Sequence, residues 1–347
     1  MGRFCLEIGS FLMNQLSDSN QQKLLSFIHC FVETPMAKMI FDDFDRLRYN
    51  QKFGGEQQCM LITGDAGCGK SSIINHYKQQ HPNQLQAGFV NNPVLVSRIP
   101  SKPTLESTMI ELLRDLGQFG SSLRKHTSND KSLTESLIAC LKKCKTELII
   151  INEFQELIEN KTREKRNQIS NRLKFISEEA QIPIVLVGMP WAVKIAEEPQ
   201  WSSRLLIRRQ IPYFKLSENP ENFIRLLMGL VRYMPFAIKP KLEDKHLTYA
   251  LFSASSGCLR TLKHLLDESV KQALIVDAET LSKEHMAKAF AIYHPEEINP
   301  FLQSIDVICA REVKKYSYYD VDAHEDEQLS PLQYTDKLSI GQLLKLR

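Results

Sequence analysis

The fold is decided by the stretch Cys59-Met60-Leu61-Ile62-Thr63-Gly64-Asp65-Ala66-Gly67-Cys68-Gly69-Lys70-Ser71. Its first five residues are mostly apolar and predict a buried strand, and its last eight match the spacing G-x-x-x-x-G-K-[ST] of a phosphate-binding loop. Residues 71–80 predict a helix, so strand, loop and helix occur in the order that such a loop requires. The glycines let backbone N–H groups converge on phosphate, and the positive end of the new helix points at the same charge.

This loop predicts a site for ATP and magnesium. Lys70 is expected to reach the β- and γ-phosphates, and the Ser71 hydroxyl is expected to ligate Mg²⁺. The other residues expected to contact the nucleotide lie around these two in the sequence: Gly64, Asp65, Ala66, Gly67, Cys68, Gly69 and Ser72.

Short apolar runs alternate with longer amphipathic segments around and after the loop. The later runs are 94–96, 148–151 and 184–187, and a short final strand is predicted at 209–211. Most of these runs are rich in β-branched residues, as in parallel strands covered on both faces. The alternation predicts an α/β fold with a three-layer parallel sheet, followed by an all-helical lid domain once the strand signal stops near residue 215.

Four segments are therefore expected. Residues 1–55 predict an N-terminal helical extension, 56–215 the nucleotide-binding α/β domain, and 216–299 the helical lid domain. Residues 300–347 have a mixed composition with an acidic stretch, which predicts a flexible tail that docks a partner.

Composition argues against several classes of protein. The 347 residues carry a net charge of +3, and nothing approaches the ~18 uninterrupted apolar residues of a membrane span. The first residues lack the apolar core and cleavage site of a signal peptide, so we expect a cytoplasmic protein that does not enter a membrane. The eight cysteines form no CxxC pair, which argues against a zinc ribbon or a thioredoxin-type redox site.

A second apolar run, 148–151, ends in Asn152 and Glu153. Glu153 is the candidate to polarise the attacking water. Asn152 stands on the metal side, where an aspartate is expected, and its amide offers Mg²⁺ an oxygen without a negative charge. The sequence therefore predicts ATP hydrolysis that is slow.

Two arginines are candidates to sense the nucleotide. Arg204 precedes the last predicted strand, a position from which it would reach the ATP of a neighbouring subunit. Arg260 lies in the first turn of a predicted helix and is expected to contact the chain's own nucleotide. In ring ATPases the corresponding strand usually ends in Asn or Thr, which contacts the γ-phosphate or the attacking water. Met189, at the end of the 184–187 run, cannot donate such a side-chain hydrogen bond.

Together these pieces resemble the AAA+ ATPases, and more closely the TniB/TnsC group of transposition regulators. The resemblance rests on GDAGCGKS at 64–71, LIIINEFQEL at 148–157, IPIVLVGMPWA at 182–192, the Ser203-Arg204 pair, GCLRTL at 257–262, and the 98–117 segment. The regulators of CRISPR-associated transposons are particularly similar. The resemblance implies a ring or helical oligomer on double-stranded DNA that links a target-selection protein to the transposase, which the 300–347 tail would dock.

Four basic residues are candidates for DNA contact. Arg98 and Lys102 follow the 94–96 strand, and Arg124 and Lys125 lie in the loop after the next helix. In an assembled ring such side chains would line the channel and neutralise phosphates without reading bases.

Two other functions fit part of the pattern. An AAA+ replication initiator or helicase loader would also use ATP and DNA, but without transposase partners. A small-molecule kinase with a phosphate loop would carry an arginine-rich lid and an aspartate where Asn152 stands.

Overall fold

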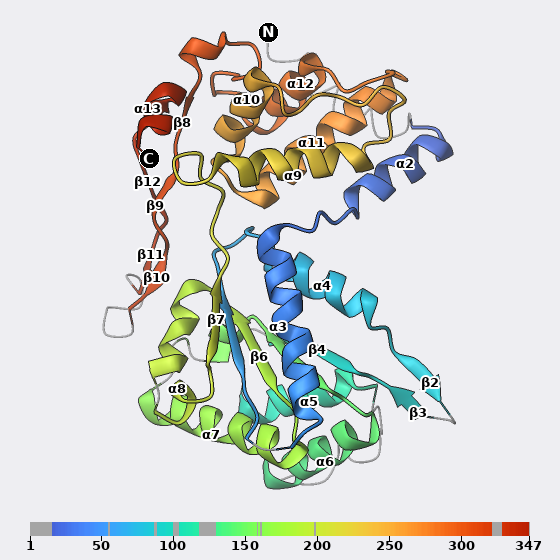
Figure 1. The fold of residues 1–347 in the computed structure, drawn as a ribbon, viewed down its shortest axis with the longest axis vertical. Helices are drawn as coiled ribbons and strands as arrows, with labels where there is room; N and C mark the ends of the chain where they lie inside the picture. The colour runs from blue at the N-terminus through green and yellow to red at the C-terminus, as the bar shows by residue number, and fades with distance from the viewer. Residues whose placement is uncertain are drawn as a thin grey trace. The chain divides into compact units, whose positions relative to one another are not determined.

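The computed structural model describes residues 16–54, 56–86, 89–99, 104–117, 130–157, 159, 162–197, 199–320 and 328–346. The chain forms two compact units (Figure 1). The α/β unit comprises Pro35–Pro212 and Tyr316–Leu332. The helical unit comprises the residues before Pro35, Tyr213–Lys315 and the residues from Gln333 on.

A five-stranded parallel sheet in the order β4-β5-β6-β1-β7 is the centre of the α/β unit. Its strands are β1 (Met60–Thr63), β4 (Val94–Arg98), β5 (Leu148–Asn152), β6 (Ile184–Gly188) and β7 (Ile207–Gln210). These are the five strands that the apolar runs predict, and they confirm the α/β fold with a phosphate loop. Thr63 pairs with Gly188 and Gln210, so the carboxyl ends of β1, β6 and β7 meet at one edge.

Helices cover both faces of this sheet. They are α3 (Pro35–Gln51), α4 (Lys70–Gln80), α5 (Leu105–Asp115), α6 (Asp130–Lys143), α7 (Arg163–Ala180) and α8 (Pro199–Ser202), with 3₁₀ turns η1 (Phe154–Leu157) and η2 (Pro190–Glu197). Residues of α5, α6, α7 and α8 share one apolar core with every second residue of β1 and β5, as the strand period of two requires. A short hairpin of β2 (Gln84–Gln86) and β3 (Phe89–Asn91) was not predicted, because each of its strands has only three residues.

Helix α3 belongs to the α/β unit, whereas α2 (Asp18–Ile28) belongs to the helical unit. The single extension expected at 1–55 is thus divided at Pro35, because the two helices bury their apolar stripes in different units. Figure 1 shows α3 along one face of the sheet. Its buried Asp43 pairs with Arg209 of β7 at 2.7 Å, and Arg48 pairs with Glu147 at 2.6 Å.

The helical unit contains the all-α domain that the sequence predicts. Its remaining helices are α9 (Pro220–Tyr233), α10 (Lys245–Ser255), α11 (Leu259–Ile275) and α12 (Lys283–Tyr293). Asn219 caps α9 by accepting the N–H of Asn222, with Pro220 in the first turn. In α2, Asn20 donates to the carbonyl oxygen of Leu274 at 3.1 Å. Within the described ranges, no helix is both long and apolar enough to cross a membrane.

The described part of 300–347 is packed, in contrast to the flexible tail expected from its composition. Its elements are η3 (Ile305–Val307), β8 (Cys309–Ala310), β9 (Val313–Lys315), β10 (Tyr318–Tyr319), β11 (Leu329–Ser330), β12 (Gln333–Tyr334), β13 (Leu338–Ser339) and α13 (Ile340–Lys345). Phe301, Ile308 and Leu343 join the core of the helical unit. The buried Glu312 carboxylate accepts the backbone N–H groups of Leu216 and Ser217 at 2.7 and 2.9 Å.

The Asp43–Arg209 pair gives a test of how α3 is fastened to the sheet. Asp43 is 1% exposed, so Asp43→Ala removes the only carboxylate described against Arg209 and leaves a small cavity. We expect the free energy of unfolding in urea to fall by about 2 kcal/mol. Asp42→Ala, at the exposed neighbouring position, is the control and should change it by less than ~0.5 kcal/mol. Equal effects of the two variants would contradict this role of the pair.

Candidate functional site

The phosphate loop joins β1 to α4 at the carboxyl edge of the sheet. Gly67 and Gly69 have positive φ angles of 82° and 104°, which favour glycine. A Cβ atom on Gly64 would lie 2.6 Å from Cys68 Sγ and 2.8 Å from the carbonyl oxygen of Ile211. The N–H of Gly64 donates to the carbonyl oxygen of Gly188 at 3.2 Å. The loop is therefore held between the ends of β6 and β7 and leaves no room for a side chain at Gly64.

Lys70 begins α4 and folds back over the loop. Its ammonium group is buried, with the residue 7% exposed, and donates to the carbonyl oxygens of Gly64 at 2.5 Å and Asp65 at 3.0 Å. Its Nζ lies 3.9 Å from Met189 Sδ. Ser71 and Ser72 are exposed in the same first turn. Because two neutral carbonyls are the oxygen acceptors described for Lys70, a phosphate would be a stronger acceptor.

The end of β5 brings the predicted polar pair to the same edge. Asn152 is the last residue of the strand, and its Oδ1 is buried with no hydrogen-bond partner in the described part of the chain. Glu153 follows with a φ of 57°, a left-handed conformation that is uncommon outside glycine. Its Oε2 accepts a hydrogen bond from Gln155 Nε2 at 2.7 Å.

Gln155 is a site residue that the sequence analysis missed. Its Oε1 accepts the backbone N–H of Met189 at 3.1 Å, so one amide links Glu153 to the end of β6. A Cβ atom on Gly188 would lie 2.8 Å from that same Oε1, so a larger residue there would displace the Gln155 amide. The sequence did offer one indication of this role: Gln155 comes two residues after Glu153, in the polar segment that follows the 148–151 run.

The donor set fits a hard cation in part. The Ser71 hydroxyl and the orphaned Asn152 oxygen are oxygen ligands of the kind that Mg²⁺ takes, and Mg²⁺ commonly keeps waters and substrate oxygens in its shell. Among the described residues, no group of three or more His, Cys, Asp or Glu side chains could hold a metal ion. A bound magnesium would therefore depend on nucleotide and water for its other ligands.

Burial raises the pKa of two carboxylates at this edge of the sheet. Burial raises the pKa of Asp65, while a hydrogen bond from Ser317 and the charge of Lys70 act in the opposite direction. Burial also raises the pKa of Glu159, which is offset by the hydrogen bond that it accepts from Trp191 Nε1 at 2.6 Å. Both carboxylates lie on segments that follow strands of the sheet.

Arg204 is not placed as the sequence analysis expects. It is 7% exposed and forms ion pairs with Glu178 at 2.5 Å and Glu56 at 2.8 Å. Its carbonyl oxygen accepts the N–H of Cys59 just before β1. An arginine that enters a neighbour's site must be exposed, whereas this guanidinium is held within its own α/β unit.

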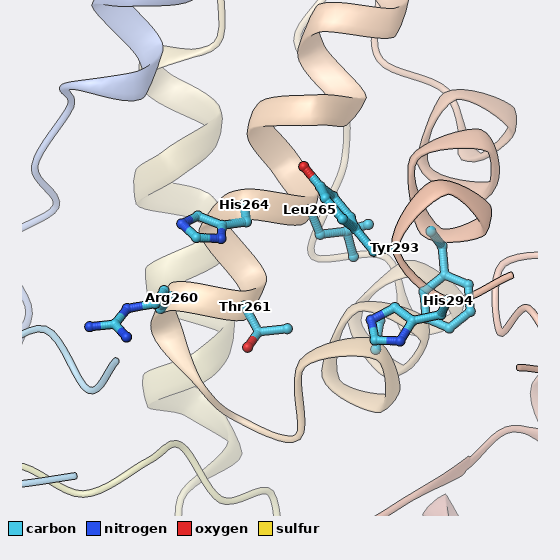
Figure 2. Close-up of a pocket in the computed structure, with 8 residues that line it drawn as sticks. Arg260, Thr261, His264, Leu265, Tyr293 and His294 are labelled. Carbon is cyan, nitrogen blue, oxygen red and sulfur yellow. The ribbon is translucent and has the colours of Figure 1, made fainter. Parts of the chain in front are cut away.

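Arg260 is exposed in the first turn of α11, in the helical unit. It lines a pocket of about 210 Å³ together with residues that include Thr261, His264, Tyr293 and His294. Figure 2 shows the Arg260 side chain extending away from Tyr293 and His294. Its contact with the nucleotide stays a prediction.

The four DNA candidates are only partly described. Arg98 is exposed at the carboxyl end of β4 and pairs in register with Asn152. Lys102, Arg124 and Lys125 lie outside the described residues.

Comparisons with known proteins agree with this geometry. Residues 28–215, more than half of the chain, match the family model described as "Bacterial TniB protein". A search of curated proteins found no match.

Three solved structures share the fold. The Aeropyrum pernix ORC2 protein in ADPNP–ADP complexes has a TM-score of 0.58 at 16% identity, over 80% of this chain and 75% of that chain. Cdc6p from Pyrobaculum aerophilum has a TM-score of 0.55 at 11% identity, over 76% and 69%. The Aeropyrum pernix ORC1 protein in complex with DNA has a TM-score of 0.53 at 16% identity, over 79% and 69%.

The family match spans the phosphate loop and all five strands of the sheet. The chain therefore belongs to the TniB family, and its fold is that of an AAA+ ATPase.

Proposed function

We propose that this protein is an ATP-dependent, oligomeric DNA-binding regulator of transposition that links a target-selection complex to the transposase. The observation that carries the proposal is a complete phosphate loop beside Asn152 and Glu153 in a chain of the TniB family. Two proteins of similar fold support the ligands, since one is in ADPNP–ADP complexes and the other is in complex with DNA.

ATP would bind where Lys70 now meets its own loop. The ammonium group would exchange the carbonyl oxygens of Gly64 and Asp65 for phosphate oxygens, and the first turn of α4 would direct its N–H groups at the same charge. Ser71 and Asn152 would hold Mg²⁺, which neutralises charge on the triphosphate.

Glu153 is the proposed base that orients the attacking water. Gln155 holds its carboxylate at 2.7 Å and is itself anchored to the Met189 N–H, so the carboxylate has a defined direction. Asn152 brings no negative charge to the metal, which makes slow turnover the expected behaviour. A slow ATPase suits a switch whose assembled state must persist until its partner arrives.

We propose duplex DNA as the ligand of the assembled protein, held by Arg98, Lys102, Arg124 and Lys125 through phosphate contacts. The transposase and the target-selection protein are the proposed partners. Arg204 would have to leave both Glu56 and Glu178 to reach a neighbouring subunit, so we do not propose it as the arginine that acts between subunits.

A replication initiator or helicase loader is the second candidate, favoured by the similarity of fold to the ORC2 and Cdc6p structures. It would share ATP and DNA and differ in its partners. Affinity capture with the full chain separates the two: recovery of a transposase supports the first, and recovery of a replicative helicase supports the second.

Lys70→Ala tests the whole proposal. Without the ammonium group, we expect ATP affinity to fall by at least about a hundredfold, since a charged hydrogen bond to phosphate is lost in a buried site. Electron microscopy with duplex DNA and a non-hydrolysable ATP analogue should then show no assembly. Gln79→Ala, on the exposed face of the same helix, should bind and assemble as the parent does. Normal assembly of Lys70→Ala would refute the nucleotide site.

Asn152→Asp tests the explanation of slow hydrolysis. A carboxylate at this position strengthens Mg²⁺ binding, and we expect turnover to rise about tenfold, equivalent to ~1.4 kcal/mol of barrier. Steady-state phosphate release over a magnesium titration measures both effects. Glu153→Gln should abolish turnover in the same assay while leaving nucleotide binding intact. An unchanged rate and magnesium dependence in Asn152→Asp would exclude the explanation.

Arg98→Ala and Lys102→Ala test the DNA contacts. Each should weaken duplex binding evenly across sequences and reduce the slope of log K against log salt by about 1. Lys142→Ala is the matched control, because α6 leads into β5 from the opposite edge of the sheet. The assignment fails if the two test variants bind DNA with the parent's affinity and salt dependence.

A further inference from the structure

The hairpin near the C-terminus lies on the nucleotide unit. The chain leaves the helical unit after Lys315, pairs β10 with β11 in antiparallel register, and returns to the helical unit at Gln333. We call the described residues 316–320 and 328–332 the arm. Although it comes about 250 residues after the phosphate loop, the arm contacts that loop directly.

Its first contact is with the loop itself. The Ser317 hydroxyl donates a hydrogen bond to Oδ1 of Asp65. Asp65 is 1% exposed, and its Oδ2 is buried without a hydrogen-bond partner among the residues described. Ser317 is therefore a principal source of stabilisation for a carboxylate that burial disfavours.

A second contact holds the arm to the segment that follows β6. Tyr319 is 3% exposed, its ring centroid lies 6.5 Å from that of Trp191, and Lys194 Nζ lies 5.3 Å from the same tyrosine centroid. Trp191 is fixed in turn by its hydrogen bond to Glu159. The arm thus spans two neighbouring parts of the carboxyl edge of the sheet, the phosphate loop and η2.

Asp65 is held from two directions. Its carbonyl oxygen accepts from Lys70 at 3.0 Å, and its side chain accepts from Ser317. A triphosphate in the loop would draw Lys70 away from that carbonyl and place several negative charges beside the buried carboxylate. Both changes act on Asp65, and both disfavour the position of its carboxylate in which it accepts the Ser317 hydrogen bond.

We propose that the arm is a nucleotide-responsive latch, closed on the phosphate loop through Ser317 and Asp65 when no nucleotide is bound and released when ATP and magnesium occupy the loop. The inference rests on the proposed nucleotide site and adds a regulatory element to it. Since the chain on both sides of the arm belongs to the helical unit, release of the arm would carry the nucleotide state from the loop to the C-terminal segment.

The latch makes a prediction whose sign is fixed by thermodynamic linkage. If nucleotide opens the latch, removing the latch must favour nucleotide by the same factor. Ser317→Ala removes the hydrogen bond that the proposed latch breaks when nucleotide binds. We expect it to bind a non-hydrolysable ATP analogue with Mg²⁺ at least about fivefold more tightly than the parent, as measured by calorimetry.

Two controls sharpen the measurement. Ser330→Ala changes the same residue type opposite Tyr318 in the hairpin and should leave affinity unchanged. In an Asp65→Ala background, Ser317→Ala should have little further effect, because the acceptor of its hydrogen bond is gone. Hydrogen exchange of the amides at 317–320 in the parent should become faster when the analogue and Mg²⁺ are added.

The outcomes separate the latch from the nucleotide site. If the parent binds the analogue but Ser317→Ala binds it equally or more weakly, the latch is refuted and the nucleotide site stands. Slower or unchanged exchange at 317–320 on binding would refute the latch as well. If the parent does not bind the analogue, the proposed nucleotide site fails, and the latch fails with it.

Discussion

The structure of the α/β unit depends on the close packing of one loop at the carboxyl edge of a parallel sheet. Gly64 lies so near Cys68 and Ile211 that a single added carbon would not fit, and its N–H is bonded to the end of β6. This packing determines where Lys70, Ser71 and the first turn of α4 begin. It also places the end of β6 next to the loop, and β5 pairs with β6, so Glu153 lies at the same edge of the sheet.

Three neutral side chains lie at the ends of β5 and β6, beside the phosphate loop. Asn152 contributes an amide, Met189 a thioether, and Gln155 an amide that connects the two strand ends. Such groups position a carboxylate and admit a metal, but they supply little additional electrostatic stabilisation to the charge that develops in phosphoryl transfer. The slow turnover that we propose rests on these neutral groups.

Ion pairs join helices and loops of the α/β unit to the sheet and to one another. Asp43 and Arg209 tie α3 to the edge strand β7, and Arg204 ties the segment before β7 to Glu178 of α7 and to Glu56. Arginine serves structure in both places, although one of them looks like a catalytic position in the sequence. The described contacts of the arm are of another kind: the Ser317 hydroxyl on Asp65, and the Tyr319 ring beside Trp191 and Lys194.

Local spacing and apolar periodicity were enough to predict the strand–loop–helix unit, the five strands, the helical second unit and the polar end of β5. The sequence did not reveal that Arg204 is buried, that Gln155 bridges two strands, or that Ser317 lies on Asp65. Each of these depends on residues far apart in the chain, and only tertiary packing decides which side chains meet. Composition likewise suggested a flexible tail at 300–347, whereas long-range burial of Phe301, Ile308 and Leu343 orders its described part.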